Sequence, residues 1–460
     1  MPKTKPDHSS DASPAARRRA EAKILLQIAL PLIAAYLAEL AMFLTTKIVV
    51  GRLGYLELAA VGIAGHLTFE VLVVLMGLLS IVGVLVAQSE GAGDKHQAGL
   101  AVRQGMLVSL ALGLPATLVV WNLGIVLELT HQDPKVIELA KPYLHALAGS
   151  VLPVLWFSVL RIFVSAIART GIIMAITVSA VALNYLLTVG LVYGAAGLPV
   201  LGLAGAGWAT TIVSWLMFFA LVAYMFWTPG LRGYGIFFDR LRVDMAMCAE
   251  IIRLGLPVAG LVALEAGLFM AVSILSGVIG AKTLATYEIV VGWIGIPFVI
   301  ALGLAEATMV RVAYGIGRDS LVTARDAGML GLGLGIAALS ALTIVPLAFP
   351  GEIVLFFIRP DDAAYAEISA LAVRLLIIAA VFQVFDGLQA VASRALRGLK
   401  DTVVPLWLAG FGYWVLGIGG GSLLAFPLQL AGTGLWLGLA CGLITTGTLL
   451  AWRFVRLTQS

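Results

Sequence analysis

The sequence predicts an all-α membrane protein with twelve transmembrane helices in two six-helix lobes, related by a pseudo-twofold axis along the membrane normal. Three observations lead to this fold class: the composition, a series of apolar runs and an internal repeat. Of the 460 residues, 61% are hydrophobic and 12% are charged, whereas an average soluble domain has about 25% charged residues. So small a charged fraction excludes an ordinary soluble domain.

Apolar runs recur along the whole chain, and each transmembrane helix needs about 20 such residues to cross the hydrocarbon core. The predicted spans are 25–50, 58–88, 104–128, 139–167, 172–194, 203–227, 249–278, 284–312, 324–349, 365–395, 402–426 and 432–455. The first run is too long for a signal-peptide core and has no small-residue cleavage site, so we expect a retained helix. The polar residues 1–24 before it are expected to form a disordered cytoplasmic tail.

The distribution of basic residues predicts the orientation. Most of the 29 Lys and Arg residues fall on the side of the N-terminus. Those on the other side are Arg52, Lys135, Lys141, Lys282 and Arg359. Because cytoplasmic loops are enriched in Lys and Arg, both termini are expected in the cytoplasm, with the protein in a bacterial cytoplasmic (inner) membrane.

The basic loops also account for the net charge of +4 and the pI near 9.0. Such charge gives no reason to expect a nucleic-acid partner. The two cysteines, Cys248 and Cys441, lack the spacing of a metal or redox site and are expected to pack as small apolar residues.

The chain matches itself. The segment LPLIAAYLAE (30–39) aligns without a gap with LPVAGLVALE (256–265). Later in each half, after a small change in loop length, LRIFVSAIART (160–170) aligns with LQAVASRALRG (388–398). The match predicts two halves of the same orientation.

The repeat divides the chain into an N-lobe at 25–227, a cytoplasmic linker at 228–248 and a C-lobe at 249–460. Parallel repeats of this kind are typical of secondary transporters, whose substrate path lies between the halves near the bilayer midplane. No G-x-x-x-x-G-K-[ST] motif is present, so ATP hydrolysis by this chain is not expected.

Acidic residues inside the predicted spans are candidate functional sites, because a charged side chain at a helix centre costs about 2.5–3.5 kcal/mol. They are Glu39, Glu70, Glu265, Glu288, Glu306 and Asp386. Glu265 and Asp386 have only apolar and small neutral neighbours along their helices. Burial there penalises the charged form unless a proton or cation binds, which predicts a Na⁺ or H⁺ coupling site. The alternative is a neutral acid held by an interhelical hydrogen bond.

The other charges are less distinctive. Glu39 occupies the repeat position of Glu265 and is a third coupling candidate. Glu306 lies five residues before Arg311, which allows either a local pair or a snorkelling side chain. Lys47 is either a counter-ion to a carboxylate across the bundle or a side chain that snorkels to the outer interface.

Four aromatic residues are candidate walls of a cavity, since aromatic faces attract organic cations. They are Trp156, Trp293, Phe382 and Phe385. The alternative for each of them is ordinary helix packing.

Six segments together resemble one family. They are VVGRLGYLELAAVGIAGHL (49–67), VAQSEGAGD (86–94), LRIFVSAIART (160–170), LNYLLTVGLVYG (183–194), LGLPVAGLVALE (254–265) and DGLQAVASRALRGLKD (386–401). The chain resembles the multidrug and toxic compound extrusion (MATE) family in its NorM-like bacterial branch. The resemblance implies a V-shaped pair of lobes, alternating access, and export of cationic or amphipathic drugs in exchange for Na⁺ or H⁺.

The resemblance also implies roles for single residues. Glu265 and Asp386 match the acids of the family's seventh and tenth helices, the two carboxylates of the C-lobe cation site, where Na⁺ is one candidate ion. Asn184 matches the first of two polar positions of the N-lobe site, and the second is Thr188.

One departure concerns the first helix. The family usually carries an Asp there, and this chain has Thr46 followed by Lys47. Glu39 lies seven residues earlier, which is two helical turns and about 10 Å along the same face. Our hypothesis is that the N-lobe acid has moved to Glu39, with Lys47 altering the electrostatics of the old site.

The sequence therefore predicts a cation-coupled (Na⁺ or H⁺) multidrug efflux antiporter for cationic or amphipathic organic compounds, working as a monomer among membrane lipids. No enzymatic activity and no cofactor beyond the transported ion are expected. Two alternatives remain, a flippase for lipid-linked oligosaccharides and a non-transporting scaffold. A flippase would need clustered Arg and Lys for a pyrophosphate, and a scaffold has no reason to keep isolated mid-span acids.

Overall fold

The computed structural model describes residues 14–237, 239, 242–358, 360 and 365–459. All regular structure in these ranges is helical. The first half contains α1 (Pro14–Gly51), α2 (Tyr55–Leu79), α3 (Ile81–Gly91), α4 (Lys95–Trp121), α5 (Leu123–Leu129), α6 (Pro134–Ala148), α7 (Val151–Ala166), α8 (Gly171–Tyr193) and α9 (Leu203–Trp227). Short 3₁₀ turns follow α8 at Ala195–Gly197 and α9 at Pro229–Tyr234.

The second half repeats this plan. It contains α10 (Met245–Ile279), α11 (Ala281–Gly317), α12 (Leu321–Leu342), α13 (Ile344–Ala348), α14 (Pro350–Phe357), α15 (Tyr365–Gly398), α16 (Val403–Gly410), a π-helical segment (Phe411–Gly420), α17 (Gly421–Ala425) and α18 (Ala431–Leu457).

The predicted number of membrane spans is confirmed. Within the described ranges, eleven helices are long and apolar enough to cross a membrane, and the pair α6 and α7, bent by 45°, supplies a twelfth. The structure differs at the start, because α1 begins at Pro14 and the later part of the predicted tail is helical. Residues 1–13 of that tail lie outside the described residues, as does Arg359, which was used for the orientation.

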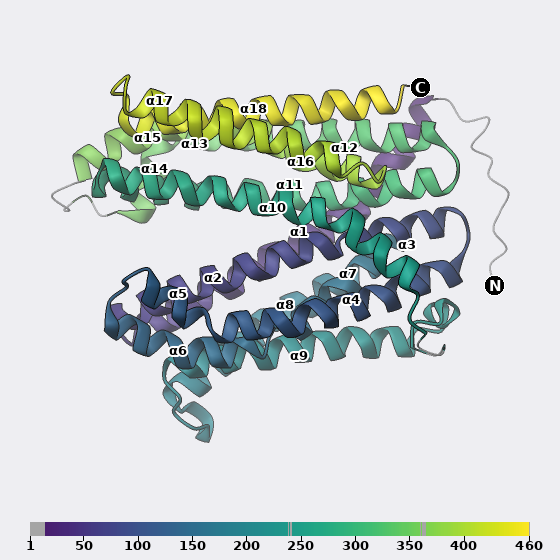
Figure 1. Cartoon of the computed structure of the whole chain (residues 1–460), viewed down its shortest axis with the longest axis horizontal. Coiled ribbons are helices and arrows are strands. Elements are labelled where there is room, and N and C mark those ends of the chain that lie inside the picture. The colour runs from purple at the N-terminus through teal and green to yellow at the C-terminus, as the bar shows by residue number, and fades with distance from the viewer. Residues whose placement is uncertain (1–13, 238, 240–241, 359, 361–364, 460) are drawn as a thin grey trace.

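Two groups of helices, α1–α9 and α10–α18, form the two lobes (Figure 1). Repeat-related residues occupy equivalent structural positions. Gly54 and Gly280 directly precede α2 and α11, with φ/ψ of 162°/169° and 155°/158°. Asp94 and Ser320, which the same alignment of the halves pairs, cap α4 and α12 through side-chain bonds to the backbone N–H three residues on. The sequence repeat is therefore a structural repeat.

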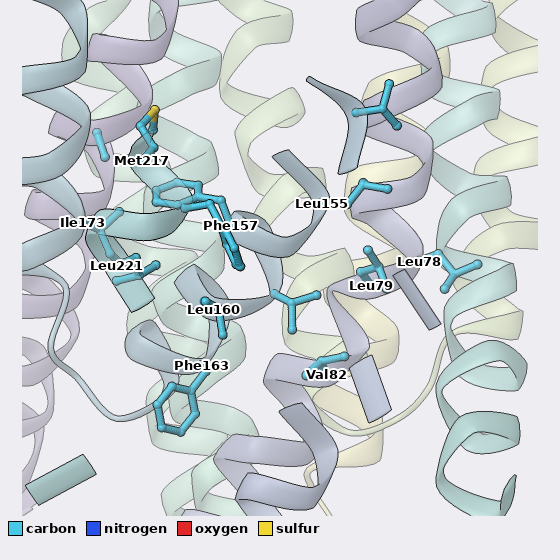
Figure 2. Packing of buried hydrophobic residues seen from close by; sticks show 14 of the residues in the cluster. Leu78, Leu79, Val82, Leu155, Phe157, Leu160, Phe163, Ile173, Met217 and Leu221 are labelled. Carbon is cyan, nitrogen blue, oxygen red and sulfur yellow. The ribbon is translucent and has the colours of Figure 1, made fainter. Parts of the chain in front are cut away.

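The core of the N-lobe receives buried residues from each of the helices α1 to α9. Figure 2 shows Phe157 and Phe163 of α7 within this core, with Leu221 of α9 nearby. Phe163 is fully buried, and its ring meets Tyr234 edge-on at 5.0 Å. This packing fixes α7, whose other face carries Arg161.

The lobes are tied together at the end where α1 begins and α18 ends, which we call the terminal end. Arg311 of α11 holds Glu21 of α1 through two hydrogen bonds of 2.6 and 2.7 Å. Gln88 Nε2 of α3 donates to the Gly398 carbonyl of α15 at 3.2 Å. At the opposite end the two groups of helices diverge (Figure 1).

The segment between the lobes lies against α4. Arg103 of α4 donates to the Gly235 carbonyl and forms an ion pair with Asp239 at 2.8 Å. Gln104 donates to the Arg242 carbonyl at 2.8 Å and accepts from the Asp244 backbone N–H at 3.2 Å. Arg240, inside the predicted linker, lies outside the described residues.

Candidate functional site

Three elements of the C-lobe place polar side chains together in its core. α10 contributes Glu265, α15 contributes Gln383, Asp386 and Gln389, and the π-helical segment contributes Tyr413. The three α15 residues share one helix face because they are spaced by three. Asp386 is 2% exposed and Tyr413 is fully buried, whereas Glu265 is only partly buried. We call these five residues the C-lobe cluster.

Several polar atoms of the C-lobe cluster have no hydrogen-bond partner among the described residues. They are Asp386 Oδ1, Gln389 Oε1, both amide atoms of Gln383 and the Tyr413 hydroxyl. Buried polar atoms are normally paired, so an unpaired group of this size is a place for a ligand. Most of these atoms are oxygens, the ligands that hard cations prefer.

The two acids of the cluster act on one another. Glu265 is the electrostatic neighbour of Asp386, and Gln389 lies beside Glu265. Two carboxylates that share a buried site repel each other when both are ionised, so one bound proton or cation relieves the repulsion. Among the described residues, no group of three or more His, Cys, Asp or Glu could hold a metal ion. The repulsion between the two carboxylates is what a bound proton or cation would relieve.

The surroundings of Glu265 differ from the sequence expectation. No cation lies near it along α10, but α15 brings Arg394 and Arg397 close enough to act on it electrostatically. Arg397 is 5% exposed and donates to Ser80 Oγ of the N-lobe at 2.7 Å. The charge of the C-lobe cluster thus interacts electrostatically with Arg397, a side chain that joins the two lobes.

The predicted N-lobe residues are brought together in part. Thr46 Oγ1 of α1 and Asn184 Oδ1 of α8 form a buried hydrogen bond of 3.1 Å. Thr188 lies one turn beyond Asn184 and is fully buried. In the described part of the chain, the Asn184 Nδ2 atom and the Thr188 hydroxyl have no hydrogen-bond partner. This site is polar and neutral.

Glu39 has a different partner. Its carboxylate accepts from Arg161 Nη1 of α7 at 2.8 Å, and the same guanidinium lies over the Tyr36 ring at 5.0 Å. Glu39 is thus paired with a cation of the chain and makes no contact with Thr46 or Asn184 among its hydrogen bonds to described residues. Its role as a relocated coupling acid stays a prediction.

One further expectation about charges is settled, and the role of Lys47 stays a prediction. The local pair between Glu306 and Arg311 is wrong, because Arg311 pairs with Glu21. Glu306 is instead 7% exposed and lies near Arg161 and Arg397. Lys47 places its ammonium 4.3 Å from the centre of the Phe43 ring.

The aromatic candidates divide. Phe382 is fully buried against Trp436, with ring centres 5.6 Å apart, and is a packing residue. Trp156 donates its indole N–H to the Met106 carbonyl and packs against Phe218 of α9. Trp293 and Phe385 are partly exposed, and the Trp293 N–H has no partner within the protein.

Sequence reasoning missed Gln383, Gln389 and Tyr413. The two glutamines could have been found from their spacing of three residues on either side of Asp386, which places all three on one face. Tyr413 lies on another element, and no local pattern in the sequence links it to Asp386.

Comparison with known proteins follows the same division of the chain. The MatE family model matches residues 31–190 and again residues 257–422. The chain belongs to the MatE family. The two matches begin at Pro31 and Pro257, which the internal repeat aligns with each other.

Relatives of this MatE-family protein align over nearly its whole length. It is 37% identical to a probable multidrug resistance protein NorM of Synechococcus, over 96% of this chain and 95% of the relative. It is also 37% identical to the multidrug resistance protein NorM of Burkholderia vietnamiensis, over 94% of each chain.

Solved structures share the fold. An outward-facing multidrug resistance MATE family transporter superimposes with a TM-score of 0.88, covering 95% of this chain and 96% of that one, at 18% identity. A eukaryotic MATE transporter gives a TM-score of 0.85 at 22% identity, with coverage of 95% and 96%. The predicted fold, with two helical lobes, is confirmed.

Proposed function

We propose that this MatE-family membrane protein is a multidrug efflux antiporter that exchanges cationic or amphipathic organic compounds for Na⁺ or H⁺. It acts in the bacterial cytoplasmic membrane, with its terminal end in the cytoplasm. The NorM proteins it resembles are described as multidrug resistance proteins. The observation that carries the coupling is the buried Asp386 beside Glu265. Its Oδ1 atom has no hydrogen-bond partner among the residues that the structure describes.

The C-lobe cluster gives the exchange its order. With the terminal end closed, as here, a proton or Na⁺ enters from the opposite end and binds between Glu265 and Asp386. Its charge relieves their repulsion and weakens the attraction between Glu265 and the arginines of α15. Drug release and ion binding thereby favour the same return to the inward-facing state.

The test is drug export from proteoliposomes under separately imposed Na⁺ and pH gradients. Wild-type protein is expected to respond to one of the two gradients. Glu265→Gln and Asp386→Asn are each expected to lose gradient-driven export by at least tenfold. The matched control is Glu367→Gln, which removes an exposed carboxylate paired with Lys282 far from the cluster. Export that follows neither gradient would contradict the proposal.

A further inference from the structure

Lys47 is a basic residue inside a predicted membrane span. Among the described residues it forms no ion pair, and its ammonium lies 4.3 Å from the centre of the Phe43 ring, one turn earlier on α1. Both side chains are partly exposed. A cation over an aromatic face is only partly compensated, because the attraction is about 0.5–2 kcal/mol.

The neighbours of Lys47 show which way it faces. His66 of α2 meets the Phe43 ring edge-on at 5.8 Å, and it lies near Lys47 electrostatically. Glu288 of α11, on the other lobe, is also an electrostatic neighbour of Lys47, although the two form no ion pair. Lys47 therefore faces α2 and α11 of the opposite lobe.

The adjacent N-lobe site adds no negative charge. Thr46 is bonded to Asn184, and Thr188 beyond it is a neutral hydroxyl. Glu39, two turns earlier on α1, is neutralised by Arg161. Because Glu288 also lies beyond ion-pair distance, the ammonium of Lys47 is available to an anionic group that comes from outside the chain.

We infer that Lys47 binds a carboxylate of the transported compound, with Phe43 and His66 forming an aromatic wall for the ring that carries it. This rests on the proposed function and makes a carboxylate on the transported compound the group that Lys47 recognises. Lys47 is a specificity residue, because an ammonium forms a strong charge-assisted hydrogen bond with a carboxylate and not with the neutral ester of the same compound.

The test uses two dyes with the same xanthene ring, rhodamine 110 with a free carboxylate and its methyl ester, rhodamine 123. Binding to the full-length protein in lipid nanodiscs is measured by fluorescence polarisation, without any gradient. Lys47→Met is expected to weaken rhodamine 110 binding by about tenfold, the loss of one bond between charged groups, and to leave rhodamine 123 within about twofold. Lys47→Arg is expected to keep the binding of both dyes near wild type.

Glu288→Gln is the matched control. If Lys47 served only to attract Glu288, Glu288→Gln would reproduce the effect of Lys47→Met on rhodamine 110, and the inference would be overturned. A Lys47→Met protein that weakens both dyes equally, or a wild type that does not bind rhodamine 110, overturns it too. Gradient-independent export of rhodamine 123 from proteoliposomes would instead count against the proposed function, because the binding comparison uses no gradient.

Discussion

The ion pair between Arg161 and Glu39 is buried unevenly, which decides which partner is costlier to lose. The Arg161 side chain is 11% exposed and that of Glu39 is 36% exposed. Glu39→Gln leaves the buried guanidinium with a neutral acceptor, and we expect a loss of about 2 kcal/mol in the free energy of unfolding. Arg161→Met leaves a carboxylate that water can reach, and we expect a loss of about 1 kcal/mol, which includes the contact with Tyr36.

The double variant leaves no uncompensated charge, so its loss should also be about 1 kcal/mol, and the coupling energy about 2 kcal/mol. The four proteins are compared by reversible unfolding in mixed micelles, followed by tryptophan fluorescence. Single effects that add to within about 0.5 kcal/mol would show that the pair is not coupled. A larger loss in Arg161→Met than in Glu39→Gln would refute the argument from burial.

The same variants bear on the relocation of the N-lobe acid. If Glu39 serves to neutralise Arg161, export should fall in Glu39→Gln and return in the double variant together with stability. Continued loss of export in a stable double variant would support a coupling role for Glu39.

Three further predictions concern other contacts. Arg397→Gln removes a buried hydrogen bond between the lobes. Losing about 1.5–3 kcal/mol of stabilisation of the closed terminal end shifts the population toward an open terminal end by about 10-fold or more. Spin labels at Ala92 and Asp319 should then move apart, and unchanged distances between them would contradict the prediction. Gly438→Ala places a Cβ 2.2 Å from the Gly421 Cα and should lower the free energy of unfolding by about 1–3 kcal/mol. Gly333→Ala, which has open space around its Cβ, should not lower it, and equal effects of the two variants would refute the packing argument. Glu367→Gln breaks an exposed pair with Lys282 and should change the free energy of unfolding by less than about 1 kcal/mol, so a larger loss in the same unfolding assay would show that this pair stabilises the fold.

The membrane fold was predictable because its determinants are local. Apolar runs of sufficient length predict the number of spans. The alignment of residues 30–39 with 256–265 predicts the division into two lobes. The tail was mispredicted at residues 14–24, where the Ala- and Arg-rich sequence PAARRRAEAK continues α1 and has good helix propensity.

The sites were only partly predictable, because their partners come from distant parts of the chain. Asp386 and Glu265 were identified as unusual from their neighbours in sequence, but the cations beside Glu265 lie on α15, more than a hundred residues away. The partner of Glu39 lies 122 residues away. The sequence shows that a charged side chain lies inside a span and needs a partner of opposite charge or a bound ion. Only the three-dimensional packing shows which residue is that partner.

The π-helical segment Phe411–Gly420 has a consequence for how the chain tolerates insertions and deletions. A π-helix winds with a wider turn than an α-helix, so it holds extra backbone in the same length. Removing one residue between Tyr413 and Gly420 would restore an ordinary α-helix and rotate the Tyr413 hydroxyl away from Asp386. The composition and apolar length of the span would hardly change, yet the deletion would remove the Tyr413 hydroxyl from the C-lobe cluster.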